Sequence, residues 1–331
     1  MKLNRRLALW PWCLVMLLFN PLTAAEVTIA VVGKTKNDSF YEQSYKGCQR
    51  FAREHPELNC IYDGADDYQD VRTQALIVRE LVKQQVDGIL VSTTDSAYLT
   101  NRALKYAKQQ NIPVITFDSD LLEPEQAYRL AYVGTNNFEF GKALGEAAKI
   151  YKTSEPQPIC IQSGHQTTPN LNKRIAGVRQ ALSGQSTERL SGASGWIEHA
   201  RCPLYTMGRR EDAITQLNNL LAYPNPPIFI AVAGFAQSHP NYIERMQPFQ
   251  ADIAKQEKII ICADTEKVQL AALKQQLSTI NIGQNPFEMG RLGAELLYGV
   301  IKHGTKPTQD KYFLDFHYCN SKNSDTCTLN Y

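Results

Sequence analysis

Short runs of apolar residues alternate with amphipathic segments along most of the chain. The clearest example lies between Val86 and Asp118, where the apolar runs 88–91 and 114–117 flank a segment with apolar residues at helical spacing. Runs without polar alternation are typical of strands that are buried on both faces of a parallel sheet. Within the segment that they flank, apolar residues recur every three to four positions, which predicts an amphipathic helix. This stretch is therefore predicted to be a βαβ unit with a right-handed crossover.

The same alternation continues on both sides of this unit. Further strands are predicted at residues 27–33, 60–62, 130–133, 159–161, 228–232, 259–262 and 279–282, and a terminal strand at 313–316. The segment 183–205 is expected to be irregular. The chain is thus predicted to be an α/β protein with two similar Rossmann-like lobes, in which helices flank parallel sheets. Several connections between the lobes would form a hinge beside a cleft.

The first 25 residues differ from the rest. Lys2, Arg5 and Arg6 precede the apolar run 7–19, and small residues end at Ala25. This pattern predicts a secretory signal peptide that is cleaved after Ala25, with an uncleaved anchor as the alternative. Removing it reduces the 35 basic residues to 32 against 33 acidic ones, a net charge near −1. Such a balance argues against nucleic acid as a partner, and export places the protein in the periplasm.

Seven cysteines remain after the signal peptide, and an oxidising compartment allows several to pair. We expect disulfides between Cys319 and Cys327, which bracket a short polar loop, and between Cys48 and Cys60. Two cysteines lie within apolar strands and are expected to be buried thiols; these are Cys160 and Cys262. The state of Cys202 stays open. No Cys-x-x-Cys pair is present, so neither a zinc ribbon nor a thioredoxin-like site is indicated.

Polar residues follow the predicted strands, at the positions where ligands bind in open parallel sheets. They are Asp38, Ser92, Thr93, Asp118, Ser119, Ser163, Asp264 and Gln284. Carboxylates and amides beside aromatic rings such as Phe40 and Tyr41 suit a small polar ligand such as a sugar. The alternative is that these residues are N-caps of the following helices.

Enzymatic functions find less support. The sequence has no Gly-x-Gly-x-x-Gly after its first strand, no phosphate-binding loop and no Gly-x-Ser-x-Gly nucleophile elbow. The six histidines lack metal-ligand spacing. An exported hydrolase would depend on clustered acids alone, and the spacing of Asp118 and Asp120 points them in different directions. We therefore predict a protein that is not an enzyme and that uses no metal or cofactor.

Five stretches carry a resemblance to a known family, and they extend over nearly the whole mature chain: 37–47, 86–91, 111–118, 173–178 and 282–286. In these stretches the chain resembles the type I periplasmic binding proteins of the ribose and galactose class, whose ligand domain is shared with the lactose-repressor family. A repressor would carry a helix-turn-helix before the first strand, where this chain has the predicted signal peptide.

The resemblance implies chain crossings near residues 133, 284 and 304. The first lobe would comprise 26–133 and 285–303, and the second 134–284 and 304–331. Together with the strand ends, it gives a predicted ligand-binding set: Asp38, Phe40, Tyr41, Thr93, Asp118, Ser119, Asn172, Arg174, Asp264 and Gln284. A structural role for Arg174 is the alternative.

Three departures from the family pattern argue against a plain pentose or hexose. Ser119 and Asn172 stand where sugar binders usually have arginine, and Ala233-Gly234-Phe235 stands where they often have Asn-Asp. The predicted function is a monomeric periplasmic solute-binding protein that closes over a small polar ligand, a carbohydrate, and delivers it to an ABC permease. The alternative is a sensor of the same fold that presents its ligand-bound form to a membrane receptor or histidine kinase, with a role in chemoreception.

Overall fold

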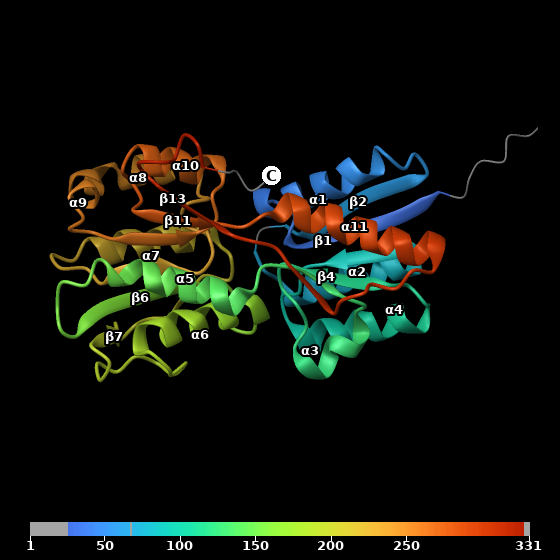
Figure 1. The fold of residues 1–331 in the computed structure, drawn as a ribbon, viewed down its shortest axis with the longest axis horizontal. Helices are drawn as coiled ribbons and strands as arrows, with labels where there is room; N and C mark the ends of the chain where they lie inside the picture. Colours follow the sequence, from blue (N-terminus) through green and yellow to red (C-terminus); the bar gives the residue numbers. More distant parts are fainter. Residues whose placement is uncertain (1–25, 67, 328–331) are drawn as a thin grey trace, which may run out of the picture.

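The computed structural model describes residues 26–66 and 68–327 and consists of two α/β lobes side by side (Figure 1). The predicted signal peptide lies outside these residues. None of the helices described has the length and apolar character needed to span a bilayer. The two lobes are built from parallel sheets covered by helices, and this confirms the predicted fold class.

The first lobe is organised around a six-stranded parallel sheet with the order β12-β5-β4-β3-β1-β2. Its strands are β1(Val27–Thr35), β2(Leu58–Ala65), β3(Gly88–Val91), β4(Val114–Phe117), β5(Tyr132–Gly134) and β12(Lys311–Phe313). Its helices are α1(Ser39–Ala52), α2(Val71–Lys83), α3(Ser96–Leu99), the π-helical turn η1(Thr100–Leu104), α4(Lys105–Gln109), the 3-10 turn η2(Glu123–Tyr128) and α11(Pro286–His303).

The second lobe has a seven-stranded sheet with the order β13-β11-β10-β9-β6-β7, and β8 also pairs with β6. Its strands are β6(Gln157–Ser163), β7(Trp196–Glu198), β8(Leu204–Tyr205), β9(Ile228–Ala231), β10(Ile260–Ala263), β11(Ile280–Gly283) and β13(His317–Asn320). Its helices are α5(Asn137–Lys149), α6(Pro169–Ser183), α7(Arg210–Leu221), α8(Tyr242–Met246), the 3-10 turn η3(Gln247–Phe249), α9(Gln250–Ala254) and α10(Lys267–Lys274). All pairings are parallel except that of β13 with β11.

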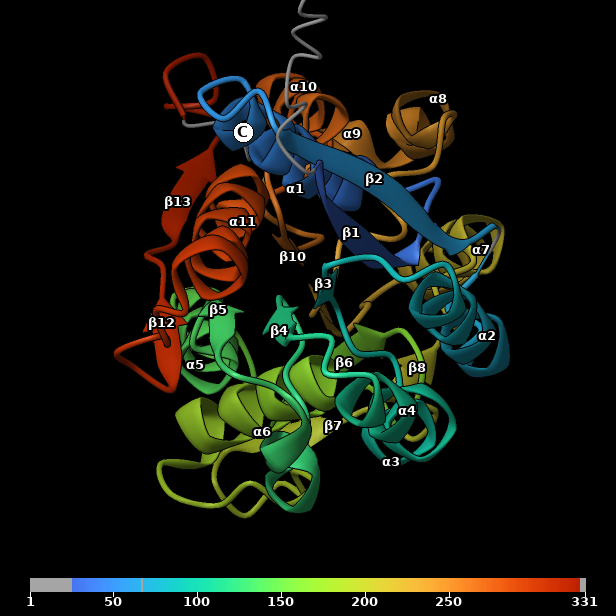
Figure 2. The same cartoon turned by 90° about the vertical axis from the view of Figure 1, so that its right-hand side faces the viewer.

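The apolar runs form strands because both faces of each sheet are covered. In β1, Val31 packs in the core beneath α1 and α11, whereas Val32 packs in the core beneath α2. Figure 2 shows α1 and α11 on one face of the first sheet and α2, α3 and α4 on the other. A polar residue at either position would be buried. The strand is therefore a continuous apolar run and does not alternate between apolar and polar residues.

Between residues 26 and 327 the chain crosses from one lobe to the other three times, after β5, after β11 and after β12. The first two crossings lie where the resemblance placed them. The third does not, because β12 pairs in parallel with β5 of the first sheet before the chain reaches β13 of the second. Residues 304–313 therefore belong to the first lobe, and the predicted terminal strand at 313–316 is replaced by two strands on either side of this crossing.

Three disulfides join described cysteines. Cys48–Cys60 and Cys319–Cys327 confirm the two expected pairs. Cys262 is a buried free thiol, as expected. The expectation for Cys160 is wrong, since it pairs with Cys202 at a Cα–Cα distance of 5.3 Å. The reason is that the segment predicted to be irregular contributes β7 and β8, which both pair with β6 and bring this part of the chain over Cys160.

Glycines allow two pairs of helices to approach closely. A Cβ at Gly141 of α5 would lie 2.1 Å from the carbonyl oxygen of Arg174 in α6. A Cβ at Gly290 of α11 would lie 1.7 Å from the carbonyl oxygen of Ser44 in α1. Real Cβ atoms do not approach other atoms this closely, so a side chain at either position would force the helices apart. The helices of each pair therefore pack with their backbones in contact.

We expect the Cys202→Ala variant to lose about 2–4 kcal/mol of unfolding free energy, because the Cys160–Cys202 bridge closes a loop with a sequence separation of 42 residues. Urea denaturation without reductant measures this loss. Cys262→Ala is the matched control, since it removes a buried sulfur without removing a cross-link. Equal losses in the two variants would contradict a stabilising role for the bridge.

Candidate ligand-binding site

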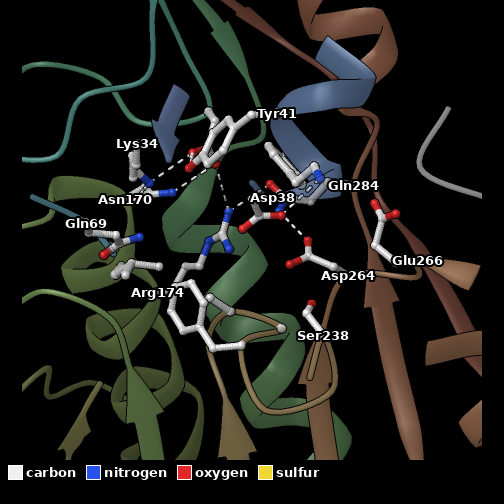
Figure 3. A pocket seen from close by; sticks show the side chains of 16 residues that line it. Lys34, Asp38, Tyr41, Gln69, Asn170, Arg174, Ser238, Asp264, Glu266 and Gln284 are labelled. Atoms are coloured by element: carbon white, nitrogen blue, oxygen red, sulfur yellow. Dashed lines mark hydrogen bonds and ion pairs between the residues drawn. The ribbon is translucent and has the colours of Figure 1, made fainter. Parts of the chain in front are cut away.

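A cavity of about 40 Å³ lies between the two lobes at the carboxyl ends of their strands (Figure 3). Both lobes contribute side chains to it, and most of these side chains are polar. The lining residues are Lys34, Asp38, Phe40, Tyr41, Gln69, Asp118, Asn170, Leu171, Arg174, Ala233, Gly234, Phe235, Ser238, Asp264, Glu266 and Gln284.

Asp118 is the centre of the hydrogen-bond network in the cavity. It follows β4 with a positive φ of 55°, a conformation that Asp adopts more readily than most residues with a side chain. From its own lobe, Oδ2 accepts hydrogen bonds from Lys34 Nζ at 2.9 Å, Ser92 Oγ at 2.8 Å and Tyr41 OH at 3.1 Å. These donors fix the carboxylate at the lobe surface.

The second lobe also contacts this carboxylate, through α6. Asn170 Nδ2 donates to Asp118 Oδ1 at 2.9 Å, and Arg174 Nη2 lies 3.6 Å from the same oxygen. Lys34 crosses between the lobes as well, donating from Nζ to Asn170 Oδ1 at 2.9 Å. The carboxylate of Asp118 is therefore shared by both lobes, and separating them breaks charge-assisted hydrogen bonds.

Arg174 is held in place by its own lobe. Its Nε donates to Asn137 Oδ1 at 2.7 Å, its Nη1 to the carbonyl of Val232 at 2.9 Å and its Nη2 to Gln284 Oε1 at 2.8 Å. The guanidinium also lies over the ring of Phe140, 4.6 Å from its centroid. These contacts support the structural alternative for Arg174, although the same side chain lines the cavity.

The pKa shifts of the buried pair Lys34 and Asp118 follow from the number of partners that each side chain has. Burial raises the pKa of Asp118. The nearby cations Lys34 and Arg174 lower it by more than burial raises it, so the pKa of this carboxyl group is below its ordinary value. Burial lowers the pKa of Lys34 by more than Asp118 restores. The carboxylate gains two cations and several donors, whereas the ammonium gains one carboxylate and one amide, so the two shifts are consistent.

Asp38 and Asp264 enter the cavity from opposite lobes. Asp38 Oδ1 accepts the backbone N–H of Phe40 at 3.0 Å, so it is the N-cap of α1 as well as a lining residue. Asp264 follows β10 with a φ of 76°, and its Oδ1 accepts from Gln284 Nε2 at 2.8 Å. Burial raises the pKa of Asp264 to about 6.

Seven of the ten predicted site residues line this cavity; they are Asp38, Phe40, Tyr41, Asp118, Arg174, Asp264 and Gln284. Three do not. Thr93 and Ser119 are fully buried behind it, where the Thr93 backbone N–H donates to the carbonyl of Ser119. Asn172 is exposed and donates to the carbonyl of Gln166, because it lies two residues along α6 from the face that carries Asn170 and Arg174.

Sequence reasoning missed several lining residues. Asn170 lies four residues before Arg174, so helical spacing could have identified it. Lys34 is the penultimate residue of β1 and looks like part of the following polar turn in the sequence. Others come from loops without a periodic signal; these are Gln69, Phe235 and Ser238.

One further cluster has the residue types of a metal site. His317, Cys319 and Cys327 place their ligand atoms within 4.8 Å of one another. The two cysteines form a disulfide, however, and a thiolate is the form of cysteine that binds metal. In this state of the protein the cluster stabilises the C-terminal loop.

The comparison with protein families agrees with the fold. Residues 29–306 match the family of periplasmic binding protein domains. The chain belongs to this family. Among curated relatives, the ribose import binding protein RbsB of Escherichia coli (strain K12) is 25% identical over 293 residues, which cover 88% of this chain and 90% of the relative. RbsB of Bacillus subtilis (strain 168) is 23% identical over 281 residues, which cover 85% and 83%.

Solved structures of the same fold include two solute-binding proteins of ABC transporters. One, from Burkholderia graminis C4D1M in complex with D-arabinose, has a TM-score of 0.76 at 22% identity and matches 93% of this chain and 100% of that chain. The other, from Agrobacterium vitis with bound D-fucose, has a TM-score of 0.76 at 19% identity and matches 90% and 97%. These similarities support the ribose and galactose class for this periplasmic binding protein.

We expect Asp118→Asn to destabilise this periplasmic binding protein by about 3–5 kcal/mol, because the buried cations Lys34 and Arg174 lose their carboxylate. Chemical denaturation measures the change. Glu80→Gln, which removes one partner of the exposed Lys83–Glu80 pair, is the control and should change stability by less than about 0.5 kcal/mol. Similar small effects in both variants would show that the buried network adds little to the free energy of unfolding.

A second prediction concerns pH. The pKa of Asp264 in the folded protein is about 6, above its usual 3.8, so the folded state favours the protonated acid. The protein therefore loses the contribution of this group to the free energy of unfolding as pH rises from about 4 to 6. Asp264→Asn should therefore be about 1–3 kcal/mol more stable than the wild type at pH 7 and nearly equal at pH 4. Denaturation at both pH values tests this. A stability difference that does not change with pH would contradict the raised pKa.

Proposed function

We propose that this protein is a periplasmic solute-binding protein that closes over a small carbohydrate and delivers it to an ABC transporter. The observation that carries the proposal is the convergence of polar side chains from both lobes on one cavity at the ends of the strands. Hydroxyl groups can donate to the carboxylates and accept from the amides and cations there. Phe40 and Phe235 supply the apolar surface that the non-polar face of a sugar ring needs.

Binding would require the lobes to separate. The cavity of about 40 Å³ is far smaller than the roughly 300–1,000 Å³ of typical pockets for small molecules. The contacts of Asn170 with Asp118 and with Lys34 close it. A ligand that enters the open form and bridges the same groups would shift the population toward closure.

Export and partners follow from the same proposal. Three disulfides among the described cysteines fit an oxidising compartment, in agreement with cleavage of residues 1–25 during export. We infer a monomer that presents its closed form to an ABC permease, with no enzymatic step. The sensor alternative predicts a membrane receptor or kinase as the partner of the same closed form. Stimulation of ATP hydrolysis by the reconstituted permease would separate the two.

A thermal-shift screen of pentoses, hexoses, polyols and their derivatives, followed by calorimetric titration, tests the proposed function. We expect a ligand that raises the melting temperature by mass action. In Asp264→Ala the affinity should fall about 10- to 100-fold, the cost of losing hydrogen bonds to a charged group. Glu244→Ala, an exposed acid in α8, should leave the affinity unchanged. The assignment of the cavity fails if the Asp264 variant binds as the wild type does.

A further inference from the structure

The charges that line the ligand cavity are unequal. Four carboxylates face two cations; the residues are Asp38, Asp118, Asp264, Glu266, Lys34 and Arg174. A neutral sugar does not compensate such an excess. The distribution of partners among these groups therefore indicates what charge the ligand carries.

Both cations are already committed to Asp118. Lys34 forms the 2.9 Å ion pair with its Oδ2, and Arg174 lies 3.6 Å from its Oδ1. The remaining donors of Arg174 go to Asn137, Val232 and Gln284. Asp118 is thus neutralised within the protein and has little capacity for a further cation.

Glu266 is also committed. It is the N-cap of α10, and its side chain accepts from the backbone of the first turn in a capping box with Gln269. A carboxylate at a helix N-terminus is stabilised by the N–H groups and the dipole of the helix. Asp38 caps α1 through Oδ1 alone, and Asp264 accepts from Gln284 through Oδ1 alone, so each of these two carboxylates keeps its Oδ2 for a ligand.

Asp38 and Asp264 approach one another from opposite lobes. Figure 3 shows both carboxylates pointing into the same part of the cavity, beside Gln284. Within the described part of the chain, no lysine or arginine forms an ion pair with either of them. Arg210 and Lys34 act on Asp38, and Arg174 acts on Asp264, from beyond ion-pair distance. Asp118 adds a repulsion to both.

Closing the lobes therefore brings two like charges into a confined space. Burial is the first cause of the raised pKa of both carboxyl groups, and the charge of Asp38 adds to the rise at Asp264. A ligand with a positive charge would remove the repulsion and gain two charge-assisted hydrogen bonds. The rings of Phe40 and Phe235, which also line the cavity, would attract a cation through their faces.

We propose that the ligand is a carbohydrate with a free amino group, whose ammonium binds between Asp38 of the first lobe and Asp264 of the second. This inference depends on the proposed function, because it concerns the ligand of the same cavity.

Matched sugars test the charge directly. Calorimetric titration at pH 7.5 would use glucose, glucosamine and N-acetylglucosamine, and the same three forms of galactose and mannose. We expect at least one free amino sugar to bind tenfold or more tightly than its neutral and acetylated forms. In Asp264→Asn, which keeps the shape and the hydrogen bond to Gln284, this preference should fall at least tenfold. Glu244→Gln should preserve it.

The pH dependence gives a second readout. Because an ammonium binds the ionised acid, its affinity should fall as pH drops from 7.5 to 5.5 through the pKa of Asp264, about 6, and this fall should weaken in Asp264→Asn. Equal or tighter binding of neutral sugars, or binding of neutral sugars alone, would overturn the inference and leave the proposed function intact. A failure of every sugar, charged or neutral, to bind would overturn both.

Discussion

The carboxylate of Asp118 is the constraint on which the arrangement of the two lobes depends. It lies at the end of a central strand of the first sheet and accepts hydrogen bonds from side chains of both lobes. A buried carboxylate is tolerated only where charges and donors compensate its lost hydration. The first lobe supplies Lys34, Ser92 and Tyr41, and the second supplies Asn170 and Arg174, so the compensation is complete only when the lobes are together. The binding cavity and the lobe interface are therefore one structure.

The fold was predictable because it depends on residues that are near one another in the sequence. Continuous apolar runs such as 88–91 become strands that are buried on both faces, and helical spacing between them locates the helices. The short strands β7, β8 and β12 carry weak signals, since a run of two or three residues has no readable period. Their positions are set by pairing with β6 and β5, which are distant in the sequence. The Cys160–Cys202 pair was missed for the same reason.

The site was partly predictable, through the rule that ligands bind at the carboxyl ends of parallel strands. This rule located Asp38, Asp118, Asp264 and Gln284. It could not distinguish a residue that lines the cavity from its neighbour, and so Ser119 was placed beside Asp118 although it does not line the cavity and its hydroxyl accepts from the backbone N–H of Asn170. The family pattern likewise selected Asn172 in α6, whereas the face of the helix that meets the cavity carries Asn170 and Arg174. Which side chains face inward is a property of the folded helix and cannot be read from strand ends.

The glycine contacts of α5 with α6 and of α1 with α11 have a kinetic consequence. Because the backbones of each helix pair lie in contact, each half of the cavity would move as one body in the proposed separation of the lobes. Under the proposed function, a ligand would meet a preformed half-site on one lobe and need not order it, so the encounter could proceed near the rate that diffusion allows. Release would instead require the lobes to part. The residence time of the ligand, and hence the affinity, would then be governed by how often the proposed hinge reopens.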